Sequence, residues 1–447
     1  MPSSRCEPPF PRKIRIPQAG SLSHMYVLTE FDALGLENEG LRLWLTLYRV
    51  RDWFLSPPEG AGPPPGEPDR PYDEVDATLR PVLTTLDRLL AEPSPDEATG
   101  EAVAAACLGA ALWAEGKGAY HTVLGFLHAA EDVDPENPHY AYNLGRVARK
   151  LAMYDESSAW LKWAHHVARG SRRWEVATLA LSGLGNLHRQ RGSLPRATRY
   201  HEAARRMARL RGLRTLEGDA LYDLAIMSFS FGEATKGAEY AKEALKAYGP
   251  GHSQVYRLAK DAAWFWMDHY GRFENAAHVF IMLMDHVWDP SYRVLLCANL
   301  ARAAAGAGWV NVFEEMWVET WGMIHQQLSR QGHAAALIQL ALGAGSLGCW
   351  DRSVMAATEA LTIATGRKET ELLVTADRIL KALDGGVIDD CDATGVFKDR
   401  QRMEPPRVDA STTDLTALFS NAMKARRDDA PESPIRDLVY PEGSLIS

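Results

Sequence analysis

Apolar residues along most of this chain recur three and four positions apart, the spacing that places side chains on one face of an α-helix. Residues 100–384 contain no stretch of alternating apolar and polar residues of the kind that predicts a β-strand. Two shorter helical patterns precede them, over 23–56 and 72–99, and glycines at 35 and 40 divide the first into two short helices. The pattern therefore predicts an all-α protein.

Composition separates these helices from their surroundings. Residues 1–22 are rich in proline and polar side chains, and they predict a disordered arm. Residues 57–71 contain seven prolines and three glycines, which favours an extended linker. The helix that follows should run from 72 to 90 and bend at Pro81.

The last segment, residues 385–447, is acidic and contains several prolines, so we expect a largely disordered tail. One amphipathic helix is predicted within it, over 413–427, where apolar side chains share a face. These side chains are Leu415, Leu418, Phe419 and Met423. The helix either frays in solvent or docks in a groove, and the groove belongs either to this chain or to a partner.

A turn motif repeats along residues 100–384, with a glycine or alanine two positions before an aromatic or other apolar residue. Small or apolar residues stand seven positions before each turn and twelve positions after it, and Trp264 is the large exception that predicts irregular packing of the fifth unit. The turn residues are Gly118, Ala152, Gly192, Gly232, Gly271, Gly308 and Gly348. Small residues at matching depths allow two helices to approach closely, so each copy predicts a helical hairpin.

The repeat resembles the tetratricopeptide repeat, most clearly in Tyr142-Asn-Leu-Gly145 and Met153-Tyr154. Ala111 and Gly145 are 34 residues apart, which is the period of that family. The later copies are spaced by about 40 residues and resemble the longer-helix variant of kinesin light chains and bacterial peptide-sensing regulators. The resemblance implies a right-handed superhelical solenoid of about seven hairpins.

Catalytic and cofactor motifs are absent or misplaced. Gly343-Ala-Gly345-Ser-Leu-Gly348 has the letters of a dinucleotide fingerprint, but it follows a helical stretch and ends in a hairpin turn. The histidines lack metal-ligand spacing, and the five cysteines are scattered. We therefore expect no enzyme activity, no metal and no cofactor. With no export or membrane segment in the sequence, we expect the protein in the cytoplasm.

Charge is distributed unevenly. The chain has a formal charge of -9, which argues against a surface devoted to nucleic acid or acidic lipid. Residues 169–214, however, contain twelve arginines and only two acidic residues. This basic patch includes Arg172, Arg173, Arg196, Arg199, Arg205, Arg206 and Arg209. It is either a solvated face or a docking surface for an acidic partner, a phosphorylated peptide or nucleic acid.

In the tetratricopeptide family the first helix of each repeat lines an inner groove, and its lining positions carry over to this chain. The groove residues that the resemblance indicates are Tyr142, Asn143, Arg146, Arg149, Asn186, Arg189, Tyr222, Phe229, Asp261 and Phe265. Asn143 and Asn186 resemble the asparagines of the family's carboxylate clamp, whose lysines are missing here.

These residues predict a non-catalytic adaptor or scaffold that binds a segment of another protein. Arginines of the groove would pair with the acidic end of that segment, and aromatic residues with its apolar side chains. Two alternatives remain open. The chain could be a peptide-responsive regulator with residues 23–90 as its output module, or it could bind nucleic acid through the basic patch.

Overall fold

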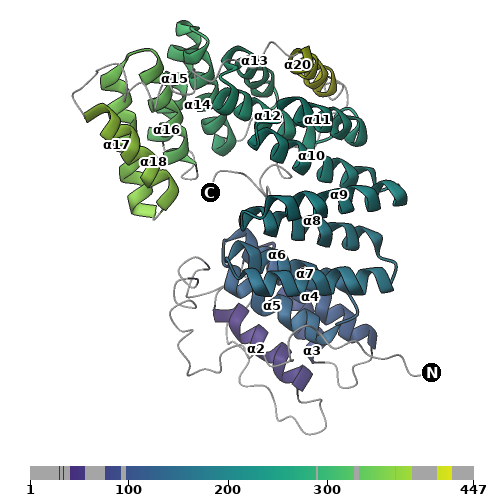
Figure 1. Cartoon of the computed structure of the whole chain (residues 1–447). Helices are drawn as coiled ribbons and strands as arrows, with labels where there is room; N and C mark the ends of the chain where they lie inside the picture. The colour runs from purple at the N-terminus through teal and green to yellow at the C-terminus, as the bar shows by residue number, and fades with distance from the viewer. Residues whose placement is uncertain are drawn as a thin grey trace. The chain divides into compact units, whose positions relative to one another are not determined.

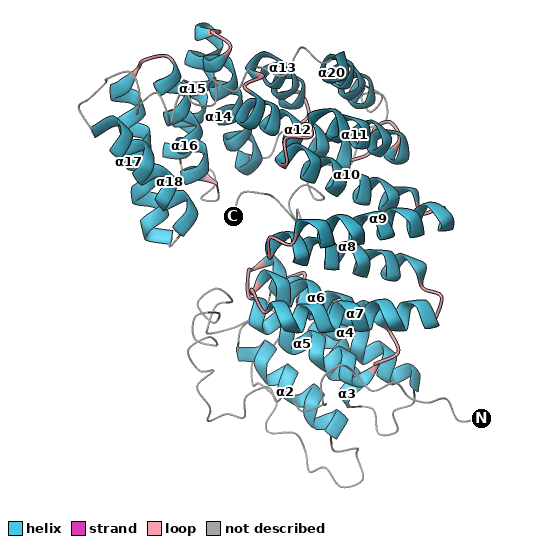
Figure 2. Cartoon of the chain, in the orientation of Figure 1, coloured by secondary structure: helices cyan, strands magenta, loops and turns pink. Residues whose placement is uncertain are grey.

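The computed structural model describes the helical part of the chain, and the secondary structure in that part consists of helices joined by short turns, with no strand among the described residues (Figure 2). The described residues are 30, 34, 41–55, 76–91, 97–287, 290–326, 332–367, 369–384 and 410–424. The predicted arm (1–22), the linker (57–71) and the tail other than 410–424 lie outside them.

Contacts divide the chain into two compact units, residues 1–216 (unit 1) and 217–447 (unit 2). The helices of unit 1 are α2 (Leu41–Leu55), α3 (Arg80–Leu90), α4 (Glu97–Gly116), α5 (Tyr120–Val133), α6 (Pro138–Lys150), α7 (Tyr154–Gly170), α8 (Trp174–Gln190) and α9 (Leu194–Arg211). Helix α10 (Arg214–Ser230) contains the boundary between the units.

The helices of unit 2 follow one another as α11 (Ala234–Tyr248), α12 (Gln254–Tyr270), α13 (Phe273–Met284), α14 (Pro290–Gly306), α15 (Val310–His325), α16 (His333–Ser346), α17 (Trp350–Arg367), α18 (Thr370–Asp384) and α20 (Ala410–Lys424). In both units consecutive helices pack against each other along the chain (Figure 1). This succession is consistent with a helical solenoid.

All seven predicted turn residues lie between consecutive helices, at the ends of α4, α6, α8, α10, α12, α14 and α16. Each has a left-handed backbone, with φ from 58° at Ala152 to 80° at Gly232. The N–H of the following residue closes the helix end, as when Ser193 donates to the carbonyl of His188 at 2.8 Å. This is the Schellman pattern, which needs a left-handed residue and explains the preference for glycine.

The small residues before and after the turns are buried, as their spacing predicts. Two hairpins share a further contact that shows their equivalence. Ser157 donates to the carbonyl of Gly145 at 2.7 Å, and Ser353 donates to the carbonyl of Ala341 at 2.8 Å. Both serines stand five positions after the turn residue. Trp264 is the one partly exposed member of the set.

The helices before the array belong to the core of unit 1. Leu43 and Leu47 of α2 are fully buried in the same cluster as Leu83 and Leu86 of α3, and α2 packs against both α3 and α5. The predicted bend at Pro81 is wrong, because α3 begins at Arg80 and Pro81 occupies its first turn. Proline is tolerated there, since the first N–H groups of a helix have no partner within it.

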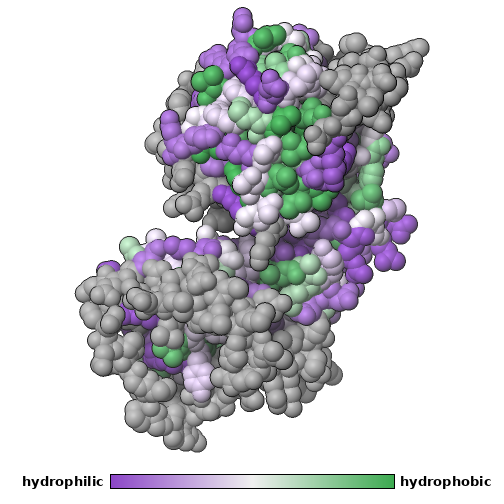
Figure 3. Space-filling model, turned by 90° about the vertical axis from the view of Figure 1, so that its left-hand side faces the viewer, coloured by the Kyte–Doolittle hydropathy of each residue, from purple (hydrophilic) through white to green (hydrophobic). Residues whose placement is uncertain are grey.

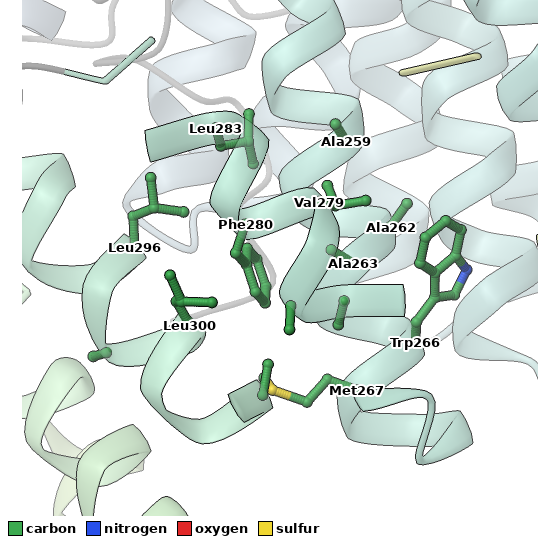
Figure 4. Close-up of a cluster of buried hydrophobic side chains, with 14 of the residues drawn as sticks. Ala259, Ala262, Ala263, Trp266, Met267, Val279, Phe280, Leu283, Leu296 and Leu300 are labelled. Carbon is green, nitrogen blue, oxygen red and sulfur yellow. The ribbon is translucent and has the colours of Figure 1, made fainter. Parts of the chain in front are cut away.

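The core of unit 2 is built from small residues of α12 and larger residues of its neighbours. Ala259, Ala262, Ala263 and Trp266 repeat at helical spacing on α12 and belong to the same buried cluster as Phe280 of α13 (Figure 4). The glycine-rich segment 343–348 lies at the end of α16 and in the following turn, as predicted. It therefore does not join a strand to a helix.

Unit 2 has exposed apolar side chains where the array stops. Helices α17 and α18 lie at the left of Figure 1, the side that faces the viewer in Figure 3. Hydrophobic residues lie among hydrophilic ones on that face (Figure 3), and α17 and α18 expose Val354, Met355 and Val374.

Candidate interaction site

The predicted groove residues of unit 1 are engaged within the chain. Arg146 donates to both carboxylate oxygens of Glu115, at 2.5 and 2.6 Å, and Lys150 donates to the same carboxylate at 2.8 Å. The Nε atom of Arg146 also donates to Asn143 at 3.2 Å. Burial raises the pKa of Glu115, but the hydrogen bonds and charges of Arg146 and Lys150 outweigh it and lower that pKa to about 2. Arg146 therefore holds an internal carboxylate.

The other groove residues of unit 1 are less accessible than the resemblance implies. Arg149 is 4% exposed, Asn186 is 3% exposed and Tyr142 is 9% exposed. Arg189 keeps partial exposure. Of the three arginines expected to pair with the acidic end of a partner, Arg146 already pairs with Glu115 and Arg149 is buried, whereas Arg189 is partly exposed.

The aromatic groove residues of unit 2 belong to the core, which corrects their predicted role. Phe229 is fully buried, and its ring packs against that of Phe265, with ring centroids 6.2 Å apart. The hydroxyl of Tyr222 donates to Asp261, and the Arg257 guanidinium lies over the Tyr222 ring. Burial, followed by the charge of Asp261, raises the pKa of Tyr222 well above its ordinary value. A partner's apolar side chains cannot reach these rings.

These pairs share a sequence signal, because their members are about one repeat apart. Tyr222 and Asp261 each stand ten positions before the turn residue of their hairpin, whereas Glu115 stands three positions before its turn residue and Arg146 six before the next one. A third set, Asp268, Arg302 and Gln339, links α12, α14 and α16 and is buried in unit 2, with Arg302 donating to Asp268 at 2.9 Å. The first helices of successive hairpins lie side by side, so acidic and donor side chains about one repeat apart can form ion pairs and hydrogen bonds with each other. Searching for such pairs would have identified the network from sequence.

The predicted basic patch, by contrast, is mostly at the surface of unit 1. Exposed members are Arg172, Arg173, Arg196, Arg199, Arg206 and Arg209, together with Arg169 and Arg211. Arg205 is partly buried and pairs with Glu202 at 3.7 Å. The patch thus presents a concentration of positive charge on α7, on α9 and in the turn between α7 and α8.

A cavity of about 380 Å³ lies within this patch, between α7, α8 and α9. It combines guanidinium groups with apolar walls, and the arginines come from the C-terminal parts of α7 and α9. Its lining residues are His165, Arg169, Trp174, Leu181, Ala203, Arg206, Met207, Leu210 and Arg211. We name it the α7–α9 cleft.

The chemistry of the α7–α9 cleft is that of an anion site with an apolar wall. The Arg211 guanidinium stacks over the Trp174 ring at 3.7 Å, which fixes its plane beside the opening. Within the described part of the chain, no carboxylate forms an ion pair with Arg169 or Arg206. Guanidinium groups in this state can each donate paired hydrogen bonds to a carboxylate or phosphate.

His165 adds a polar but uncharged atom to the lining. Burial lowers its pKa; the hydrogen bond to the Ala177 carbonyl opposes this, but the charge of Arg169 adds to the lowering, so the neutral ring is favoured at pH 7. Its Nδ1–H donates to the carbonyl of Ala177 at 3.0 Å, which leaves Nε2 as an acceptor. The positive charge of the cleft therefore comes from its arginines.

No group of three or more histidine, cysteine, aspartate or glutamate side chains within the described ranges could hold a metal ion. The helices that the structure describes also include none long and apolar enough to cross a membrane. Neither a scan against protein-family models nor a search of curated proteins gives a match to this chain. Within the described ranges, the α7–α9 cleft joins exposed arginines to an apolar wall, and it is the candidate interaction site.

Proposed function

We propose that this chain is a non-catalytic, cytoplasmic scaffold of tetratricopeptide-like hairpins in a right-handed superhelical solenoid, and that it binds an acidic segment of a partner protein at the α7–α9 cleft. The observation that carries the proposal is the lining of the cleft. Arg169, Arg206 and Arg211 lie around an apolar wall formed by residues such as Leu181 and Met207.

The lining favours a particular kind of segment. Guanidinium groups pair with carboxylates in a bidentate manner, and Trp174 holds one of them flat. A cavity of about 380 Å³ has room for an apolar side chain of the same segment next to Met207. We therefore expect recognition of a sequence in which glutamate or aspartate flanks leucine or phenylalanine.

An acidic protein segment suits the α7–α9 cleft and its charged surroundings better than nucleic acid does. A chain with a formal charge of -9 repels a polyanion beyond the patch, whereas a short acidic segment stays within it. The apolar wall also offers a leucine or phenylalanine side chain a place that a phosphate backbone does not use. The peptide-responsive regulator stays a prediction from the sequence.

Fluorescence anisotropy with labelled peptides, in which glutamates flank a leucine or a phenylalanine, tests the proposal. We expect binding that weakens as salt is raised, because exposed charges are screened. Replacing Arg169 and Arg206 by glutamate should weaken it by about tenfold per residue, which corresponds to about 1.4 kcal/mol each.

The matched control is the pair Arg196→Glu and Arg199→Glu. It changes the net charge equally, and both residues are exposed on α9 outside the cleft lining. Equal loss of binding in both pairs would show that general charge rather than the cleft is responsible. If a labelled oligonucleotide binds more tightly than every peptide, the basic patch recognises nucleic acid and not an acidic protein segment.

A further inference from the structure

Helix α20 packs against three consecutive helices of unit 2, α11, α12 and α13 (Figure 1). Leu415, Phe419 and Met423 repeat every four positions along it and are buried. Leu418, which the sequence placed on the same face, is 39% exposed. The predicted amphipathic helix is therefore docked on this chain and does not fray in solvent. We use the name α20 site for the surfaces of α11, α12 and α13 that it contacts.

The α20 site lies where two hairpins meet along one side. Their first helices, α10 and α12, are joined by the Tyr222–Asp261 hydrogen bond and by the Tyr270 hydroxyl, which donates to the carbonyl of Phe229 at 2.7 Å. Helix α20 contacts both second helices, α11 and α13. Helices α12 and α13 form the fifth hairpin, for which Trp264 predicts irregular packing. A separate helix thus fills the seam between the second helices.

Two contacts define how a helix sits in the α20 site. The ring of Phe419 packs against that of Trp266, with centroids 6.3 Å apart. The N–H of Gly251 donates to the carbonyl of Ala422 at 3.0 Å. The last carbonyls of a helix have no partner within it, so this bond satisfies one of them and fixes the end of the helix. Gly251 has a φ of 77°, which favours glycine at this position.

We propose that the α20 site is a helix-binding site, occupied by α20 within the chain, that takes an amphipathic helix of a partner protein in its place. That helix carries large apolar side chains four and eight positions apart, like Leu415, Phe419 and Met423. Among the residues of α20 whose burial the structure describes, Leu415, Phe419 and Met423 are the buried ones, and their burial must offset the entropy of ordering a whole helix, so exchange is feasible. The site belongs to unit 2 and stands independently of the α7–α9 cleft.

A competition experiment on the full chain tests the proposal. The probe is a labelled peptide with the sequence of residues 410–424. Because α20 occupies the site, the unchanged chain should bind it weakly. A Phe419→Asp chain, which places a charge against Trp266, should release α20 and bind the peptide at least about tenfold more tightly. A second peptide that keeps only the leucine, phenylalanine and methionine positions on an otherwise alanine, lysine and glutamate helix should bind comparably.

Leu418→Asp provides the matched control, because it introduces the same charge on the exposed side of α20 and should leave peptide binding unchanged. Several results would overturn the proposal. One is a Phe419→Asp chain that unfolds cooperatively by circular dichroism yet gains no binding. Another is loss of cooperative unfolding in that chain, which would make α20 a fixed part of the fold. If the second peptide does not bind, the spacing of the apolar side chains is not what the site recognises. If the protein forms a dimer by exchanging α20, the natural occupant is a second copy of this chain.

Discussion

The equivalent turns at Ala152 and Gly192 allow a test of the repeat in which one exchange of residues should have opposite effects. Both residues adopt the left-handed backbone, with φ of 58° and 70°. Each ends the first helix of a hairpin in unit 1. We expect Gly192→Ala to destabilise the protein and Ala152→Gly to stabilise it.

The magnitude follows from the local geometry. A Cβ added at Gly192 would meet no atom within 4 Å, so its cost is confined to the backbone. The left-handed conformation costs a residue with a side chain about 1–2 kcal/mol. Glycine loses about 0.4–1 kcal/mol more on folding, because its unfolded chain is freer. The net change in the free energy of unfolding is about 0.5–1 kcal/mol, negative for Gly192→Ala and positive for Ala152→Gly.

Urea unfolding followed by circular dichroism measures the change as a shift of the midpoint. The control is Gly170→Ala, the same exchange at the last residue of α7, where φ is not positive and no atom would meet the Cβ. Alanine is the better helix former, so this variant should be neutral or slightly more stable. Shifts of the same sign for Gly192→Ala and Gly170→Ala would refute the assignment of the turn.

Two further predictions concern contacts within unit 1, one between consecutive hairpins and one inside a hairpin. The pKa of Glu115 falls from 4.5 to about 2 when burial is outweighed by Arg146 and Lys150, so its stabilisation is present above pH 4.5 and lost toward pH 2. Glu115→Gln should lower the free energy of unfolding by about 3 kcal/mol at pH 7, and parallel pH curves for the two chains would contradict this. A Cβ at Gly185 would lie 2.5 Å from Nε2 of His201, so Gly185→Ala should cost about 1–3 kcal/mol in urea unfolding. Adding His201→Ala should recover part of it, and an unchanged midpoint in Gly185→Ala would disprove the close approach.

Local patterns were sufficient for the helices and turns because their signals lie within a few residues. The turn residues predicted each hairpin bend, since the left-handed conformation is a property of the residue itself. The same reasoning failed for Phe229 and Phe265. An aromatic residue on a first helix is equally compatible with a groove and with a core, and the packing of α10 against α12 buries both. Periodicity alone does not separate these two environments.

The sequence by itself determined an all-helical chain of repeated hairpins, the positions of their turns and the concentration of arginines over residues 169–214. Only the tertiary structure decided which charges remain available. It paired Arg146 with Glu115, left Arg169 and Arg206 beside an apolar cleft, and seated α20 against Trp266. The physical reason is that pairing and burial depend on which helices become neighbours. That is set by contacts between residues far apart in the chain, whereas a helix or turn is set by the residues next to it.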